Sequence, residues 1–374
     1  MQAVRLLPEG GAWQRANRAE LVAVEASSLA LQLVAEEDAT IAAGLSMSGD
    51  QVRVDLRTDA EGGAWLAADL RAGPEEHYLG FGERFDSLDQ RGKEIDLWVE
   101  DGAQVGLTYI PVPFCLSSAG YGLHIDTDLR CVVRLATPDD PGVVSIRNAA
   151  PALGLTIIPG RTPKEILSAY TAIAGRPETP PAWVFGPWKS RDWQTADQAG
   201  IREDVEMQQA LGLPATVKLI DARWEAAYHT FDFDPVKFPD PRAMIEHIQA
   251  HGSRLVVWLS PWMAVDNEDD PNDAYDECAE RGYLIKNPAG EVYVHRLGNN
   301  PMLVGSCIDF TYPEAVAWWQ DQIRRLAALG VGGINTDFGE QVPEDAVFYD
   351  GRTGKEMRNV FPRLYNEITY EALQ

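Results

Sequence analysis

Carboxylates and tryptophans recur at four places in the second half of the sequence, each at the end of a short apolar run. Carboxylates accept hydrogen bonds from sugar hydroxyls, and indole rings suit the flat apolar faces of sugar rings. One such place would mean little, but four in succession indicate a carbohydrate site. The four stretches are residues 188–193 (WKSRDW), 221–225 (DARWE), 258–262 (WLSPW) and 335–340 (NTDFGE).

The elements that must position these residues follow from the hydrophobic pattern. Residues 255–259 are apolar throughout, as in a parallel strand that is buried on both faces. Residues 313–329 carry apolar side chains at three- and four-residue spacing, which predicts a helix. We expect strands at 183–189, 215–221, 254–260 and 332–337, and helices at 196–211, 241–250, 313–329 and 359–373.

This alternation makes four βα units, which are half of a (β/α)8 TIM barrel. In such barrels the active-site residues lie at the carboxyl ends of the strands, where the four stretches fall. A complete doubly wound sheet is the alternative. Against it, no glycine-rich phosphate loop follows the first strand, but periodicity alone does not separate the two folds.

The first part of the chain has a different texture. Short alternating runs separated by turn residues predict an antiparallel β-sandwich over residues 1–174, with a helix near 163–174 that Thr162 would cap. Residues 175–182 (GRPETPPA) form a stiff proline-rich linker. The partial catalytic barrel then occupies residues 183–374. The predicted sandwich strands are 29–34, 51–56, 120–126, 131–136 and 153–158.

Composition excludes several functions. The formal net charge is −25, which disfavours binding to nucleic acid or to anionic membranes, because both require basic patches. No stretch of 18 apolar residues exists, and the N-terminus lacks the apolar core of a signal peptide, so we expect a cytoplasmic protein. The unpaired outer strands of a half-barrel would favour association, so a homo-oligomer is one alternative.

The sequence offers no metal or cofactor motif. Its six histidines and four cysteines lack the spacing of zinc ligands, and the acidic run at 266–277 lacks the order of an EF-hand. The triplet Asp337-Phe338-Gly339 matches a protein-kinase motif, but the other kinase motifs do not accompany it. We therefore expect no metal and no organic cofactor.

Six collinear segments between residues 81 and 367 resemble glycoside hydrolase family 31, especially its α-xylosidase-like branch. The longest, residues 332–367, is similar to the nucleophile region of that family. A chance match to one motif is easy, whereas six in the same order are specific. The other five are 81–92 (FGERFDSLDQRG), 120–128 (GYGLHIDTD), 175–188 (GRPETPPAWVFGPW), 231–241 (FDFDPVKFPDP) and 308–319 (IDFTYPEAVAWW).

The resemblance implies roles for individual residues. Asp337 falls at the catalytic nucleophile, and Asp221 at the aspartate that binds distal sugar hydroxyls. Trp258 falls at an aromatic wall of the pocket, and Trp193 at a loop aromatic that closes it. Asp101 falls on a loop of the sandwich domain that reaches the site.

Further residues complete the predicted site. Glu340 is expected behind the nucleophile, and Arg223 and Trp224 either line the pocket or bind loop backbone. Asn335 stands where xylosidase-like members commonly carry Lys, which leaves the sugar open. Structural alternatives apply to each residue: a buried carboxylate or loop cap for the aspartates, and core packing for the tryptophans.

The implied activity is that of a retaining α-glycosidase that removes terminal α-linked xylose or glucose from an oligosaccharide or α-glycoside. Such an enzyme pairs its nucleophile with a second carboxyl that acts as acid and base. In the family that residue lies on a later strand than this chain reaches, so we expect these 374 residues to lack it and to be inactive alone. A non-catalytic carbohydrate-binding fragment is the alternative.

Overall fold

The computed structural model describes the chain except for residues 2, 8–13, 17, 26, 35–39, 60–64, 102–105, 193–194, 266–271, 297–303 and 341. The chain divides into two compact units, Met1–Pro177 and Glu178–Gln374. The division falls within the proline-rich stretch 175–182.

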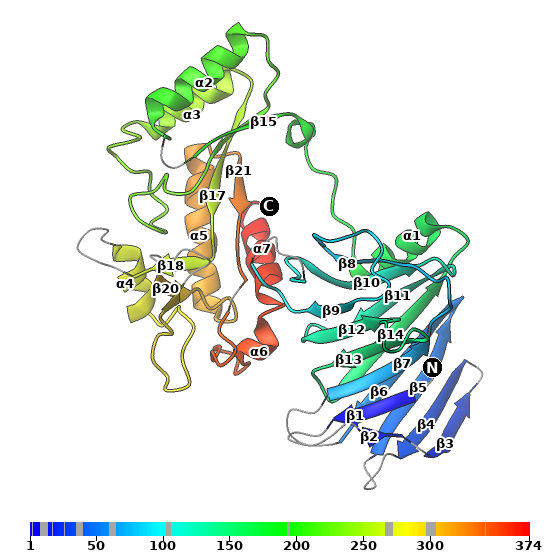
Figure 1. Cartoon of the computed structure of the whole chain (residues 1–374). Coiled ribbons are helices and arrows are strands. Elements are labelled where there is room, and N and C mark those ends of the chain that lie inside the picture. Colours follow the sequence, from blue (N-terminus) through cyan, green and yellow to red (C-terminus); the bar gives the residue numbers. More distant parts are fainter. Residues whose placement is uncertain are drawn as a thin grey trace. The chain divides into compact units, whose positions relative to one another are not determined.

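The first unit contains two antiparallel sheets (Figure 1). One has the order β2-β1-β7-β13-β12-β9, formed by β1 (Ala3–Leu7), β2 (Gln14–Arg15), β7 (Trp65–Arg71), β9 (Glu94–Leu97), β12 (Cys131–Leu135) and β13 (Val143–Asn148). The other has the order β3-β4-β5-β6-β14-β11-β10-β8, formed by β3 (Arg18–Glu25), β4 (Ser28–Val34), β5 (Thr40–Ser48), β6 (Gln51–Thr58), β8 (Tyr78–Gly82), β10 (Pro111–Ser117), β11 (Tyr121–Asp126) and β14 (Ala152–Pro159).

The two sheets pack against each other through side chains that alternate along each strand between the buried and the exposed face. In β12, Cys131, Val133 and Leu135 are buried, while the two residues between them are partly exposed. They belong to the same hydrophobic cluster as Ile41 and Leu155 of the other sheet. The predicted antiparallel sandwich is confirmed, as are its five predicted strands, which correspond to β4, β6, β11, β12 and β14.

Helix α1 (Pro163–Ala174) closes the first unit and begins where the sequence predicts. The Thr162 side chain accepts a hydrogen bond from the backbone N–H of Glu165 at 3.3 Å, and Pro163 occupies the first helical turn. Ile166 packs with Phe114 and Ile158 in a small separate cluster.

The second unit is built on a parallel sheet of four strands in the order β15-β16-β17-β21. Neighbouring strands follow the order of the chain, as in a barrel, whereas a doubly wound sheet reverses direction. The four predicted βα units are confirmed. They comprise β15 (Trp188–Arg191), α2 (Gln198–Ala210), β16 (Val217–Ile220), α3 (Pro241–Ala250), β17 (Arg254–Leu259), α5 (Pro313–Leu329), β21 (Gly333–Thr336) and α7 (Phe361–Glu371).

Two details of the second unit differ from expectation. The first strand begins at Trp188, after the 3-10 turn η2 (Ala182–Phe185), because Pro187 cannot donate to a ladder. Between β17 and α5 the chain also forms a small antiparallel sheet and a helix that the sequence did not predict. These are β18 (Trp262–Ala264), β19 (His295–Arg296), β20 (Val304–Cys307) and α4 (Asp273–Glu280), and a further short helix, α6 (Gly354–Met357), precedes α7.

Candidate active site

The register of the parallel sheet brings four predicted site residues to one face. Ile220 pairs with Val257, so Asp221 comes level with Trp258, and Trp258 pairs with Asn335. Side chains at matching positions of neighbouring parallel strands point to the same face of the sheet. Asp337 points to that face too, because it lies two residues beyond Asn335. With strands about 4.8 Å apart and a rise of about 3.3 Å per residue, the Cα atoms of Asp221 and Asp337 are about 12 Å apart.

Each carboxylate oxygen of Asp337 accepts a hydrogen bond. The indole Nε1–H of Trp258 donates to Oδ2 at 2.7 Å, and the backbone N–H of Phe338 donates to Oδ1 at 3.0 Å. The backbone N–H of Asp337 donates to the carbonyl of Leu259 at 2.8 Å. The residue remains partly exposed. The carboxylate is thus fixed in orientation in a residue that is not buried.

The backbone turns sharply after Asp337. Phe338 has φ 61° and Gly339 has φ 110°, both in the left-handed region. A Cβ on Gly339 would approach the Cα of Pro362 at 3.2 Å, so glycine suits this position on two counts. The turn directs the chain away from the sheet and leaves the carboxylate at the sheet edge.

Trp258 is more deeply buried than we expect of a residue that forms the wall of a ligand pocket. Only 4% of the residue is exposed. The centroid of its ring lies 5.4 Å from the ring centroid of His229, 6.0 Å from that of Tyr228 and 6.1 Å from that of Phe338. Its polar edge is the part that reaches the site, through the hydrogen bond to Asp337.

Trp224 and Arg223 have different surroundings despite being adjacent. Trp224 is fully buried, and its ring is tilted by 54° against that of Phe233, with 4.7 Å between the ring centroids. Its Nε1–H donates to the carbonyl of Trp258 at 2.7 Å. It therefore binds the backbone of strand β17, which is neither of the two roles that the sequence left open, and its side chain does not line a surface. Arg223 is exposed, and its guanidinium lies over the ring of Tyr228 at 5.3 Å.

Asp221 and Asn335 are both partly exposed. Oδ1 of Asp221 accepts a hydrogen bond from the backbone N–H of Ala222 at 2.7 Å, and its own N–H donates to the carbonyl of Arg191 at 3.2 Å. Both residues therefore present polar groups on the face that carries Asp337.

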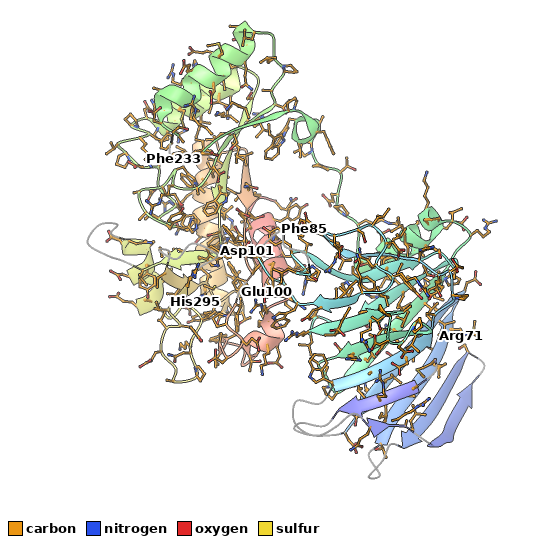
Figure 2. The ribbon with its side chains drawn as sticks, in the orientation of Figure 1. Arg71, Phe85, Glu100, Asp101, Phe233 and His295 are labelled. Atoms are coloured by element: carbon orange, nitrogen blue, oxygen red, sulfur yellow. The ribbon has the colours of Figure 1, made fainter. Side chains whose placement is uncertain are left out.

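Three other predicted residues have separate positions. Glu340 is 7% exposed, at the turn that follows Asp337. Asp101, drawn beside Glu100 in Figure 2, belongs to the unit Met1–Pro177. Trp193 lies outside the described residues.

Tyr365 is a supporting residue that the sequence did not reveal. It is fully buried, and its hydroxyl donates to the carbonyl of Leu259 at 2.8 Å, the same carbonyl that binds the N–H of Asp337. Burial raises the pKa of Tyr365 well above its ordinary value, and the nearby charge of Asp337 adds to the effect. The phenol thus stays neutral and fixes the end of β17. No motif marks it, because it comes from α7.

A second unpredicted group connects Glu225, His229 and Ser260. The ring nitrogens of His229 lie 2.7 Å from Oε2 of Glu225 and 2.7 Å from Oγ of Ser260. Exposed fractions are 3%, 0% and 1%, respectively. Glu225 and Ser260 lie within the stretches that the sequence singled out, but His229 lies in the loop beyond.

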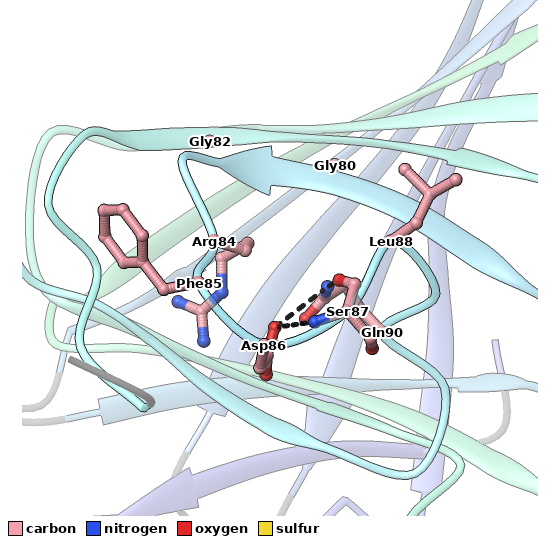
Figure 3. Close-up of a pocket in the computed structure, with 8 residues that line it drawn as sticks. All are labelled: Gly80, Gly82, Arg84, Phe85, Asp86, Ser87, Leu88 and Gln90. Atoms are coloured by element: carbon pink, nitrogen blue, oxygen red, sulfur yellow. Dashed lines mark hydrogen bonds between the residues drawn. The ribbon is translucent and has the colours of Figure 1, made fainter. Parts of the chain in front are cut away.

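Two hollows are lined by other sets of residues. A cavity of about 580 Å³ in the first unit is lined by the end of β8 and by the segment that follows it (Figure 3). Asp86 in this segment accepts a hydrogen bond from the backbone N–H of Ser87 at 2.7 Å and forms an ion pair with Lys93 at 2.9 Å. A cavity of about 480 Å³ in the second unit lies beside α3 and α5 and includes Phe231, Phe238 and Leu329.

Cysteines and possible metal ligands do not add to the site. Cys115, Cys131, Cys278 and Cys307 are buried and unpaired, and burial raises the pKa of each thiol. Among the described residues, no group of three His, Cys, Asp or Glu side chains could hold a metal ion. Within the same residues, no helix combines the length and apolar character needed to cross a membrane.

Two family models match the chain. Residues 177–374 match the TIM-barrel domain of glycosyl hydrolases family 31, and residues 8–131 match the N-terminal galactose mutarotase-like domain of glycosyl hydrolase 31. The first match covers more than half of the chain.

Curated relatives are longer than this chain. The α-xylosidase XylQ of Lactiplantibacillus pentosus is 30% identical over 318 residues, which are 83% of this chain and 40% of that protein. An α-xylosidase of Emericella nidulans is 29% identical, with 83% and 39% covered. A sulfoquinovosidase of Escherichia coli is 25% identical, with 89% and 52% covered. The chain thus spans about 40% of the length of the two α-xylosidases.

Solved structures share the fold. An uncharacterized protein from Listeria monocytogenes superposes with a TM-score of 0.84 at 21% identity, covering 99% of this chain and 43% of that one. A family 31 dextranase from Flavobacterium johnsoniae, solved with isomaltotriose, gives a TM-score of 0.77 at 19% identity, with 97% and 46% covered. The four βα units are therefore part of a TIM barrel.

Proposed function

Because the chain belongs to glycoside hydrolase family 31, we propose that it carries the nucleophile part of a retaining, exo-acting α-glycosidase, with Asp337 as the nucleophile. The observation that supports this best is that two donors orient the Asp337 carboxylate while the residue as a whole stays partly exposed. An attacking carboxylate needs both properties, since it must reach the anomeric carbon and must be aligned with it.

The proposed reaction has two steps. Asp337 forms a bond to the anomeric carbon as the bond to the leaving oxygen breaks, and that oxygen takes a proton from a second carboxyl. The same group then removes a proton from the water that hydrolyses the glycosyl ester.

The second carboxyl belongs, in this proposal, to residues outside these 374. A retaining pair is separated by about 5–5.5 Å, whereas Asp221 lies two strands from Asp337. Glu225 and Glu340 are buried. The greater length of the α-xylosidase relatives is consistent with this assignment.

The substrate proposed is a terminal α-linked xylose or glucose. Asp221 would accept hydrogen bonds from sugar hydroxyls, with Asn335 and Arg223 on the same unit. Asp101 and Trp193 keep the sugar-binding roles that the resemblance to the family implies. Glu340 would support the turn after the nucleophile. Trp258 would act mainly through its N–H on Asp337, because so little of its ring is exposed. Relatives named α-xylosidase and α-glucosidase support this sugar class.

Carbohydrate binding without turnover is the second candidate, and one observation favours it: none of Asp221, Glu225 and Glu340 is an exposed carboxyl at the distance from the nucleophile that a retaining pair needs. A turnover assay beside a sugar-binding assay on the 374-residue chain separates the two functions. We expect binding without hydrolysis, and turnover comparable to that of full-length relatives would contradict the assignment of the acid.

The catalytic proposal is tested on a version extended through the rest of the barrel. We expect hydrolysis of nitrophenyl α-xyloside or α-glucoside, with NMR showing the α-anomer of the sugar formed first. Asp337→Asn should abolish turnover without preventing folding. Activity on β-glycosides alone, or inversion of the anomer, would refute the proposal.

A further inference from the structure

Glu225, His229 and Ser260 form a buried acid–imidazole–hydroxyl chain. Its contacts define where the imidazole proton lies. The backbone N–H of Ser260 donates to Nε2 of His229 at 3.3 Å, and a backbone N–H cannot accept, so Nε2 is an acceptor. The Oγ–H of Ser260 donates to the same nitrogen at 2.7 Å. The imidazole proton therefore sits on Nδ1 and is donated to Glu225 Oε2 at 2.7 Å.

Each carboxylate oxygen of Glu225 accepts a hydrogen bond from a different donor. Oε2 accepts from His229, and Oε1 accepts from the backbone N–H of Phe231 at 2.9 Å. Both donors are buried, so each requires an acceptor. A carboxylate has two acceptor oxygens, whereas an isosteric amide has only one.

The order Ser–His–Glu is that of a nucleophilic triad, but burial excludes that chemistry. A nucleophilic serine must meet its substrate. Ser260 is 1% exposed and His229 is not exposed at all. The chain of hydrogen bonds therefore serves a purpose inside the protein.

Its location indicates that purpose. Glu225 and His229 belong to the loop between β16 and α3, which begins with Asp221, and Ser260 directly follows β17. The His229 ring also packs at 5.4 Å against Trp258, the donor to Asp337. The hydrogen bonds thus join the loop that begins at Asp221 to the strand end that holds Asp337.

We infer that Glu225, His229 and Ser260 are positioning residues that fix the Trp258 indole on the carboxylate of Asp337. Deepening the proposed function, this inference rests on the assignment of Asp337 as nucleophile. Loss of the Ser260 hydroxyl or of one Glu225 acceptor would release the His229 ring and alter the Trp258–Asp337 hydrogen bond, although neither residue touches substrate.

The test is the indole N–H signal of Trp258 in the 374-residue chain labelled with [15N]tryptophan and [15N]histidine. Trp258→Phe assigns the signal, and Asp337→Asn, by weakening the acceptor, defines the size of shift to expect. Ser260→Ala and Glu225→Gln should each move or broaden it. Glu225→Gln does so because the amide must turn its N–H₂ toward either His229 or Phe231.

Ser306→Ala is the matched control. Ser306 is also fully buried in the second unit, and its hydroxyl has no hydrogen-bond partner among the described residues. This variant should leave the Trp258 signal unchanged, whereas a general loosening of the core would move it as well.

Two outcomes would overturn the inference. One is that Ser260→Ala, like the control Ser306→Ala, leaves the indole signal of Trp258 unchanged. The other is a His229 that carries its proton on Nε2 in the unaltered chain, which long-range 1H–15N correlation reads directly even where a variant does not fold. Neither readout depends on turnover. If the Trp258 signal shifts in Ser260→Ala and the His229 proton lies on Nδ1, but the extended enzyme hydrolyses no α-glycoside, then the proposed function is refuted. The positioning network would still stand.

Discussion

At the scale of single residues, the hydrogen bond from Trp258 to Asp337 decides how the proposed nucleophile is held. The second donor is a backbone N–H, which substitution cannot remove. The indole is therefore the only side-chain donor to Asp337 among the described residues, and it can be tested without altering the carboxylate itself.

Trp258→Phe in the extended enzyme should lower kcat by about 10- to 100-fold. A hydrogen bond to a charged group contributes about 1.5–3 kcal/mol, and each 1.36 kcal/mol is tenfold in rate. Steady-state kinetics on an aryl α-glycoside measures this. Trp188→Phe is the control, because that residue is 44% exposed and its indole N–H donates to the carbonyl of Val184 at 3.0 Å. Equal rates for the two variants would remove Trp258 from the mechanism.

The sequence predicted which residues share one face of the parallel sheet better than it predicted what each side chain contacts. Asp221, Trp258, Asn335 and Asp337 could be grouped because strand ends in a parallel sheet meet at one edge. The burial of Trp224 and the contacts of Trp258 depend on which ring each packs against, and this is fixed by segments far apart in the chain. Tyr365 and His229 escaped prediction for the same reason.

At the scale of elements, the pairing of β8 with β10 requires a glycine at position 82. Gly82 has φ 91°, and a Cβ there would lie 1.8 Å from the carbonyl oxygen of Ile110. Gly92 has a similar φ of 84° but open space around it. The two positions therefore separate steric overlap from backbone strain.

Gly82→Ala should lower the free energy of unfolding well beyond the cost of Gly92→Ala. A left-handed φ costs an alanine about 1–2 kcal/mol at either site, and only Gly82 adds a clash with backbone. Chemical denaturation of both variants measures the difference. Similar losses would mean that β10 moves aside without cost.

A cluster of charges ties α2 to β15 and β16. Arg191 donates to both oxygens of Asp204 at 2.9 Å, and Lys218, which is 1% exposed, also binds this carboxylate. Burial acts to raise the pKa of Asp204, but the hydrogen bonds from Arg191 and Lys218 outweigh it and bring the pKa to about 2.

Asp204 should therefore stabilise the fold above about pH 4 and cease to do so as the pH falls toward 2. Its folded pKa lies below its unfolded value, so the unfolded chain binds the proton first; allowing for partial solvent screening, the effect is about 1–2 kcal/mol. Asp204→Asn should lower Tm at pH 7, and the gap to the unaltered chain should narrow at low pH. A gap that is constant with pH would contradict this assignment.

Most elements were predictable because their patterns are long and regular. The helix at 313–329 carries its apolar residues on one side, and β17 is apolar throughout. The strands β18, β19 and β20 were missed because strands of two to four residues are too short to show a period. The start of β15 was misjudged because the apolar run before Pro187 resembles a strand although the proline interrupts the ladder.

At the scale of the whole molecule, each unit has its own hydrophobic core. One buried cluster draws only on residues up to Leu155, and the largest cluster of the second unit begins at Ala196. A segment with its own core can fold alone, whereas the open parallel sheet of the second unit pairs β15 and β21 on one side only within the described residues.

Residues 1–177 expressed alone should therefore fold cooperatively, with coincident unfolding curves from circular dichroism and tryptophan fluorescence. Residues 178–374 alone should be the less stable piece and more prone to associate, which sedimentation would detect. A first unit that unfolds without cooperativity would mean that its two sheets require the rest of the chain.

The four buried thiols make the protein a convenient host for site-specific labelling. Thiols react as thiolates, and burial both covers these sulfurs and keeps them protonated. A cysteine introduced at Leu88, which is 80% exposed, would react with a maleimide dye while the native thiols remain unmodified. A fluorophore placed there would report from the segment that lines the cavity of the first unit, with no native cysteine first removed.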